Sequence, residues 1–210
     1  MRKSIKRLFL IRHGEGVHNV DWYTYGEKAY YMKEKTDPHL TNIGINQAKK
    51  CGEIFKEINN IELIITSPMM RCLETMDNVF KNVDVPVLAH GDAREFPMGL
   101  QYSNKRSIKS ELEKKFNYVD FSNLTSEEDD RWNSERLETL EELNVRKKKL
   151  LDFIKKRPEK NIALVSHSSY IMNFLYDSLD ESHDKELKHC YPYEKIIQNT
   201  DCGRHMESSF

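Results

Sequence analysis

Four short and mainly apolar runs constrain the fold of this chain more than any other feature. Each run holds four or five residues, and together they cover Leu8–Ile11, Leu63–Thr66, Val85–Ala89 and Ile162–Val165. Continuous apolar runs of this length are typical of β-strands that are buried on both faces of a sheet. We therefore expect a sheet that is covered by other elements on both sides.

Amphipathic patterns between these runs predict helices. They cover Thr41–Ile58, a helix that starts at Ser67–Pro68, Arg136–Lys156, and a helix from His167 to about Leu179. Threonine and serine are preferred helix N-caps, and proline suits the first helical position. Strands that alternate with helices predict an α/β fold with a mostly parallel sheet.

Two segments fall outside this alternation. Asp92–Asn133 carries aromatic and charged residues without a clear strand pattern, and we interpret it as an insertion over the sheet edge and part of a pocket. Residues 199–210 are polar and read as a loose tail. The chain of 210 residues then fits one domain over residues 1–198.

Composition argues against several classes of protein. The 33 basic and 34 acidic residues give a net charge of −1, which does not favour a nucleic-acid binder. No apolar run approaches the ~20 residues of a membrane span, and Leu8–Ile11 is shorter than the ~7–15 apolar residues of a signal peptide. The four cysteines show no CxxC spacing, so we expect free thiols and a cytoplasmic protein without a metal site.

Chemically active residues follow three of the four predicted strands. Arg12 and His13 follow the first strand, Arg71 lies just after the second, and His167 follows the fourth. Because ligands bind at the carboxyl ends of strands in open α/β sheets, we expect these side chains to converge. Two arginines and two histidines together favour an anion between them, and a phosphoryl group matches the donors of arginine.

The ordered set of motifs resembles the histidine phosphatase superfamily, which includes the cofactor-dependent phosphoglycerate mutases. The matching residues cover roughly positions 7 to 175: Leu10–Glu15 with Asn19, Leu40-Thr41 with Gly44 and Gln47-Ala48, Ser67-Pro68 with Arg71 and Thr75, Arg94-Glu95, and Val165–Ser168. A closer likeness is to the phosphoglycerate-mutase-like proteins of plants and fungi. It rests on His18-Asn19, Asp37–Thr41, Lys105–Ser107, Asp120–Ser122 and the acidic stretch with Trp132.

The resemblance implies a three-layer α/β/α fold and a set of roles. His13 corresponds to the nucleophile that takes the phosphoryl group, and Glu95 to the general acid and base. The remaining matched residues correspond to a phosphate pocket, namely Arg12, Arg71 and His167, with Asn19 as a further contact. Asp92 lies three residues before Glu95 and is the alternative acid. Such a site needs neither a metal nor a cofactor when arginine and histidine supply the positive charge.

Several further residues have two readings each. Lys105 and Arg106 either grip a second anionic group of the substrate or form a solvated basic turn, and His18 either lines the pocket or is a loop histidine. The tyrosines at positions 23, 25, 30 and 31 either flank the pocket mouth or pack their own loop. His183 and His189 receive no role.

The sequence favours a phosphatase for a small phosphorylated substrate. The alternatives are a mutase-type phosphoryl transfer and a non-catalytic protein that binds phosphorylated ligands. Phosphoglycerate mutases place a basic residue and a tyrosine after the matched glutamate, where they hold the substrate carboxylate. Phe96 and Pro97 stand there in this chain and lack those groups, which argues against the mutase.

Overall fold

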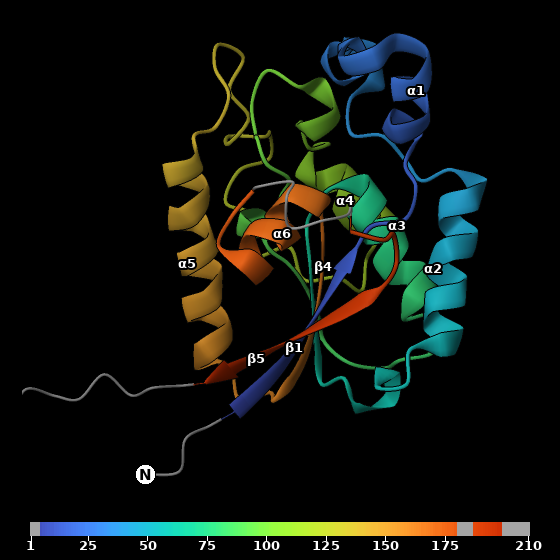
Figure 1. The fold of residues 1–210 in the computed structure, drawn as a ribbon, viewed down its shortest axis with the longest axis vertical. Coiled ribbons are helices and arrows are strands. Elements are labelled where there is room, and N and C mark those ends of the chain that lie inside the picture. Colours follow the sequence, from blue (N-terminus) through green and yellow to red (C-terminus); the bar gives the residue numbers. More distant parts are fainter. Residues whose placement is uncertain (1–4, 180–186, 199–210) are drawn as a thin grey trace, which may run out of the picture.

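A computed structural model of the protein describes residues 5–179 and 187–198. Its centre is one sheet of five strands in the order β3-β2-β4-β1-β5 (Figure 1). The strands are β1 Ile5–Arg12, β2 Leu63–Thr66, β3 Val87–Ala89, β4 Asn161–Ser166 and β5 Pro192–Gln198. The first four strands pair in parallel, and only β5 runs antiparallel, against β1.

All four predicted strands are present, and β2 has the predicted bounds. The fifth strand, β5, was missed because Glu194 and Lys195 interrupt its apolar character. All of its residues except Ile197 are partly buried or exposed, since it lies at the edge of the sheet. A strand of this kind gives no continuous apolar run and no clean alternation.

Helices cover both faces of the sheet, which confirms the layered α/β prediction. Helices α2 (Asn42–Ile54), α3 (Met70–Val79) and α4 (Lys109–Lys115) bury side chains on one face, together with Phe9 and Ile11 of β1. Helices α5 (Leu140–Lys156) and α6 (Ser168–Tyr176) pack on the other face, against Leu8 and Leu10. The alternation along β1 therefore divides the core into two halves. Figure 1 shows the two helical layers on either side of the sheet.

Helix starts agree with the sequence in part. Thr41 caps α2 and accepts a hydrogen bond from the Gly44 amide, as predicted. The predicted start at Ser67–Pro68 was wrong, because α3 begins at Met70 after an extended Met69. Helix α5 begins at Leu140 rather than Arg136, since Thr139 and Glu142 form a capping box there.

The Asp92–Asn133 segment contains α4 and lies beside the edge strand β3. The Asp120 amide donates to the Val87 carbonyl, and the Ala89 amide donates to the Asp120 carbonyl, both at 2.9 Å. The remaining short elements are α1 (Val17–Tyr25) and 3-10 turns at Gly26–Tyr31, Lys33–Lys35, Ile58–Asn60, Gly91–Ala93 and Tyr102–Asn104.

Three cysteines fall within the described residues, and Cys51, Cys72 and Cys190 are all buried free thiols. Cys202 and the predicted tail at 199–210 lie outside the described residues. Among the helices that the structure describes, none is both long and apolar enough to cross a bilayer.

Candidate active site

The strand register brings the predicted site residues to one edge of the sheet. Arg12 at the end of β1 pairs with Ser166 at the end of β4, and Thr66 of β2 pairs with Val165. Residues that follow the three strands therefore emerge side by side. The His13 amide donates to the Ser166 carbonyl at 3.0 Å, which extends the pairing one residue beyond β1.

His13 lies at the centre of this edge and is 1% exposed. Its ring centroid lies 5.2 Å from that of His167, 5.5 Å from that of His18 and 5.7 Å from that of His189. The Nδ1 atom lies 2.7 Å from the Gly14 carbonyl oxygen. Because a carbonyl only accepts hydrogen bonds, Nδ1 carries the proton in this contact, and Nε2 keeps a lone pair.

The loop after His13 is held from two sides. The Gly14 amide donates to Thr75 Oγ1 at 3.0 Å, and the Thr75 hydroxyl donates to the Arg71 carbonyl at 2.7 Å. On the other side the loop touches α2 so closely that a Cβ on Gly44 would lie 2.1 Å from the Glu15 carbonyl oxygen. Glycine is required at Gly44 because of this approach, and the approach fixes the loop that carries His13.

Both arginines of the predicted phosphate pocket are buried, with Arg12 4% and Arg71 1% exposed. Arg12 Nη1 donates to the Leu187 carbonyl at 2.6 Å. Arg71 donates from Nη1 to the Ser103 carbonyl at 2.7 Å and from Nη2 to Asn104 Oδ1 at 2.9 Å. Arg71 Nε is buried and has no hydrogen-bond partner within the described part of the chain.

His167 stands at the N-cap position of α6 and is fully buried. Its Nε2 lies 2.8 Å from Ser67 Oγ and 3.4 Å from Cys72 Sγ. Ser67 follows β2, so this contact joins the ends of β2 and β4. Ser67 therefore orients a ring of the candidate site instead of starting a helix.

The electrostatics of the site favour neutral imidazoles. Burial lowers the pKa of His13 well below its ordinary 6.5, and the charge of Arg71 lowers it further. The pKa values of His18 and His167 fall well below 6.5 for the same two reasons. A neutral imidazole keeps its nitrogen lone pair, which is the form that acts as a nucleophile.

The pKa of Glu95 shifts so that this group favours its protonated form, whereas the buried histidines favour their deprotonated form. Its Oε1 accepts hydrogen bonds from the Phe96 amide at 2.8 Å and from the Tyr170 amide in the first turn of α6 at 3.4 Å. Burial raises the pKa of Glu95, while the Phe96 bond, Arg71 and Arg12 act against that rise. A carboxyl that holds its proton longer is suited to donate it to a leaving oxygen.

Arg146 of α5 fixes the backbone that carries Glu95. It donates from Nη1 to the Asp92 and Arg94 carbonyls at 3.0 and 2.7 Å, and from Nη2 to the Glu95 carbonyl at 3.0 Å. Glu138 holds the same guanidinium through Nε and Nη2 at 2.6 and 3.0 Å. This ion pair is buried, and the sequence pattern of α5 gave no sign of it.

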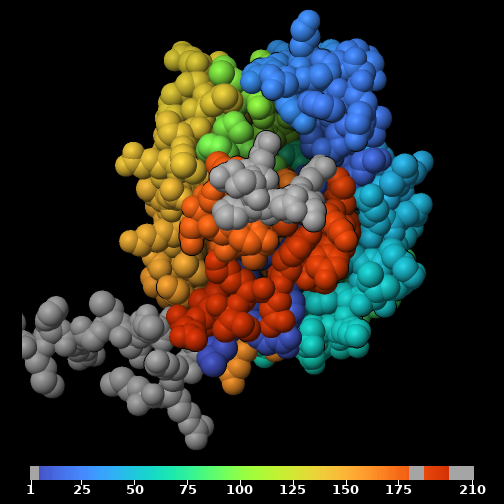
Figure 2. All heavy atoms as spheres, viewed as in Figure 1, coloured from blue at the N-terminus to red at the C-terminus, as the bar shows by residue number. Residues whose placement is uncertain are grey.

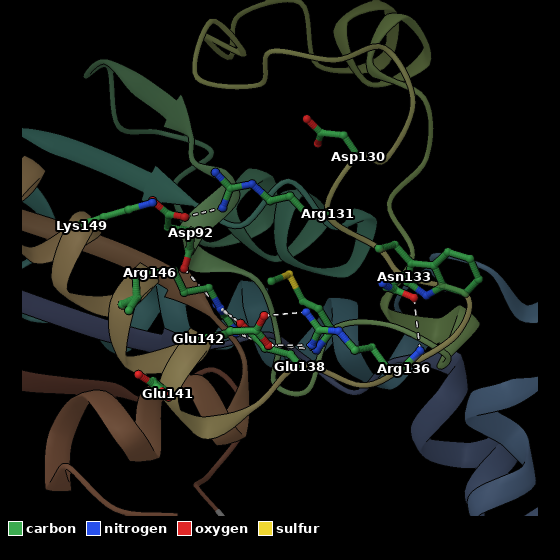
Figure 3. Close-up of a pocket in the computed structure, with 13 residues that line it drawn as sticks. Asp92, Asp130, Arg131, Asn133, Arg136, Glu138, Glu141, Glu142, Arg146 and Lys149 are labelled. Carbon is green, nitrogen blue, oxygen red and sulfur yellow. Dashed lines mark hydrogen bonds and ion pairs between the residues drawn. The ribbon is translucent and has the colours of Figure 1, made fainter.

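Asp92 lies in a different environment from Glu95. Its carboxylate pairs with Arg131 beside a cavity of about 580 Å³, which is bounded by α5 and the segment around Arg136 (Figure 3). His90 Nδ1 lies 3.9 Å from the other carboxylate oxygen. Arg131 and His90 are therefore the neighbours of the Asp92 carboxylate. The Glu95 carboxyl instead contacts α6 and lies close enough to Arg71 and Arg12 for their charges to lower its pKa.

A cleft of about 510 Å³ opens beside the buried cluster. Its lining comes from the loop after β1, α1 and the segment before β5: Arg12, Glu15, Asn19, Trp22, Tyr23, Tyr30, Leu187, Lys188 and His189. Asn19 also accepts a hydrogen bond from the Gly16 amide at 2.9 Å. In Figure 2 the α1 region is drawn in blue at the upper right of the molecule.

Lys105 and Arg106 make their side-chain contacts within the Asp92–Asn133 segment. Lys105 Nζ lies 4.8 Å from the ring centroid of Trp132. The Arg106 guanidinium donates to backbone carbonyls of Ser107 and of residues 126–128. That these two residues grip a second anionic group of the substrate stays a prediction.

His189 is the site residue that sequence reasoning missed. Its Nδ1 donates to the His13 carbonyl at 2.6 Å, and the neighbouring Cys190 amide donates to the Arg12 carbonyl at 2.9 Å. The segment reaches the site because β5 runs antiparallel to β1. Recognising β5 in the sequence would have placed His189 beside His13.

Within residues 5–179 and 187–198, no group of three or more histidine, cysteine or acidic side chains is arranged to hold a metal ion.

We predict that acid destabilises the protein through its buried histidines. An unfolded histidine takes up a proton near pH 6.5, whereas the folded pKa values of His13, His18 and His167 are lower, so the unfolded state binds more protons. The contribution of these neutral histidines to the free energy of unfolding is fully present above pH 6.5, and it is lost as the pH falls below that value. Each histidine adds a slope of about 1.4 kcal/mol per pH unit to the free energy of unfolding.

Urea unfolding at several pH values between about 8 and 5.5 measures this slope. The variant His18→Gln should have a slope smaller than that of the wild type by about one proton. Equal slopes in the wild type and His18→Gln would contradict the electrostatic account.

Comparisons with known proteins identify the family of the chain. The sequence profile of the histidine phosphatase superfamily (branch 1) matches residues 8–194. Phosphoglycerate mutase-like protein 1 of Arabidopsis thaliana is 33% identical over 215 residues, covering 85% of this chain and 73% of that protein. Phosphomutase-like protein 3 of Candida albicans is 27% identical over 186 residues, covering 79% of this chain and 58% of that protein.

A solved structure shows the same fold. The phosphoserine phosphatase of Entamoeba histolytica, in complex with 3-phosphoglyceric acid, superposes with a TM-score of 0.55 at 24% identity, covering 92% of this chain and 89% of that chain. At this identity the likeness concerns the fold alone. With the profile match over most of the chain and the Arabidopsis relative, the chain belongs to the histidine phosphatase superfamily, branch 1.

Proposed function

We propose that this protein is a phosphatase that hydrolyses phosphomonoesters through a phosphohistidine at His13. The observation that carries the proposal is the state of His13. Its Nδ1 donates to the Gly14 carbonyl, its pKa is lowered by burial, and its Nε2 is therefore a neutral nucleophile. Arg71 supplies positive charge close by, and its buried Nε is a donor suited to a phosphoryl oxygen.

The proposed reaction has two steps. First, His13 Nε2 attacks phosphorus, the bond from phosphorus to the ester oxygen breaks, and protonated Glu95 gives its proton to that oxygen. Then water attacks the phosphohistidine, Glu95 takes the proton of the water, and the bond between phosphorus and nitrogen breaks. Inorganic phosphate leaves, and His13 and Glu95 return to their starting states. Arg12, Arg71 and His167 stabilise the charge on the phosphoryl oxygens in both steps.

The residues after Glu95 support hydrolysis over transfer to a second hydroxyl. Phe96 packs against the core half that contains α5 and α6, so it contributes no polar group to a substrate. Arg106 is engaged by backbone carbonyls. A mutase has to hold its substrate through a second anionic group, and these neighbours do not provide that grip.

The relatives named as phosphoglycerate mutase-like keep the mutase as the second candidate. A coupled assay for interconversion of 2- and 3-phosphoglycerate, with phosphate release measured in the same sample, separates the two. Phosphate release without interconversion is the expected result, and interconversion that exceeds release would favour the mutase.

We predict that His13→Ala lowers phosphate release by on the order of 10³-fold or more, because the nucleophile is removed. Release from p-nitrophenyl phosphate and a panel of phosphorylated metabolites measures the effect, with EDTA present throughout. His39→Ala is the control, since this ring lies at an exposed position. Most of the activity surviving in His13→Ala would refute the mechanism.

We predict that Glu95→Gln slows esters with poor leaving groups more than p-nitrophenyl phosphate, whose leaving oxygen needs little protonation. The ratio of kcat/KM for p-nitrophenyl phosphate to that for an alkyl phosphate should rise in Glu95→Gln. In Asp92→Asn the ratio should stay at the wild-type value, because Asp92 pairs with Arg131. A rise in Asp92→Asn instead would move the acid role to that residue.

A further inference from the structure

Helix α1 exposes its large aromatic side chains. Of its residues Val17–Tyr25, only His18 is buried, and that ring lies beside His13. Trp22 is 45% and Tyr23 is 82% exposed. Exposed aromatic surface forgoes the free energy that burial would give, so packing of the loop does not explain these two rings.

The exposed rings lie on the cleft that reaches the candidate phosphate pocket. Trp22, Tyr23 and Tyr30 line it at α1 and the following turn, while Arg12 and His189 line it beside His13. The rings of Trp22 and Tyr23 meet edge to face, with centroids 5.7 Å apart. One continuous cleft thus joins the candidate phosphate-binding groups to the aromatic side chains Trp22, Tyr23 and Tyr30.

The volume of the cleft exceeds what a phosphate needs. At about 510 Å³ it falls in the range of ~300–1,000 Å³ that is typical of sites for whole small molecules. Most of this space is therefore available to the group that is esterified to the phosphate. Asn19, Glu15 and Lys188 line the same space and offer hydrogen-bonding groups of both kinds, which suits a flat ring with polar edges.

We propose that the substrate of this phosphatase carries a flat heteroaromatic ring of the nucleobase type, which stacks on the face of Trp22 and meets Tyr23 at its edge while its phosphate reaches Arg12. Aromatic faces bind bases through stacking, and this contact tolerates different bases because each has a π-face. The inference rests on the proposed function. It gives Trp22 and Tyr23 a role in binding the substrate and not in stabilising the fold.

The test compares two esters with the same leaving oxygen. Adenosine 5′-monophosphate and ribose 5-phosphate both release a 5′-hydroxyl, so they differ in the base and not in the chemistry at phosphorus. The wild type should show a kcat/KM for adenosine 5′-monophosphate at least about tenfold higher. Trp22→Ala should remove about that factor through KM, which is the size expected for one lost stack, and should leave ribose 5-phosphate unchanged.

Two variants control for damage to α1. Tyr25→Ala removes another exposed aromatic ring of α1 that does not line the cleft, and it should leave the ratio of the two esters unchanged. Trp22→Phe keeps an aromatic face and should retain most of the preference. Equal loss with both esters in Trp22→Ala would show that the ring supports the fold, and would overturn the inference.

A binding measurement separates this inference from the proposed function. Calorimetry on His13→Ala, which cannot form the phosphohistidine, gives the affinity for each ester without turnover. Tighter binding of adenosine 5′-monophosphate than of ribose 5-phosphate, lost in His13→Ala with Trp22→Ala, supports the inference even if the catalytic scheme fails. Equal affinities for the two esters would overturn it even if phosphate release depends on His13 as proposed.

Discussion

Positive charge buried at one edge of the sheet is the constraint on which the rest of the site depends. Arg12 and Arg71 are both nearly inaccessible to solvent, and an isolated buried charge is unfavourable. Protein oxygens from Leu187, Ser103 and Asn104 satisfy part of their donors. Burial keeps the neighbouring imidazoles neutral by lowering the pKa of His13, His18 and His167, and the charge of Arg71 lowers these pKa values further. The proposed phosphoryl ligand would bring negative charge to both arginines.

The fold holds these groups with few degrees of freedom. Parallel pairing of β1, β4 and β2 sets the order in which His13, His167 and Arg71 emerge. Thr75 ties the His13 loop to α3, and the ion pair of Arg146 with Glu138 ties the Glu95 loop to α5. The proposed nucleophile and the proposed acid are thus anchored to helices on opposite faces of the sheet. This arrangement suits a reaction in which positioning and charge stabilisation supply most of the rate.

The sequence predicted the parts of the fold that local patterns encode. The apolar runs located four strands, and Thr41 marked the start of α2, because burial on both faces and capping leave local signals. The sequence-based predictions failed where tertiary contacts determine the local structure. Strand β5 is an edge strand with a mixed composition, so both it and His189 were missed. Ser67 resembles a helix cap but contacts His167 instead, and Arg106 is held by carbonyls that only the folded insertion brings near.

Trapping of the phosphorylated enzyme tests the central claim most directly. Glu95→Gln should accumulate the intermediate, because the loss of the base slows the attack of water more than the first transfer from p-nitrophenyl phosphate. Rapid quenching in alkali preserves a phosphohistidine, which acid destroys, and mass spectrometry of the peptides then locates the added phosphate. The account predicts an alkali-stable, acid-labile phosphate on His13 that is absent from His13→Ala. An acid-stable phosphate, or one on another residue, during turnover would contradict it.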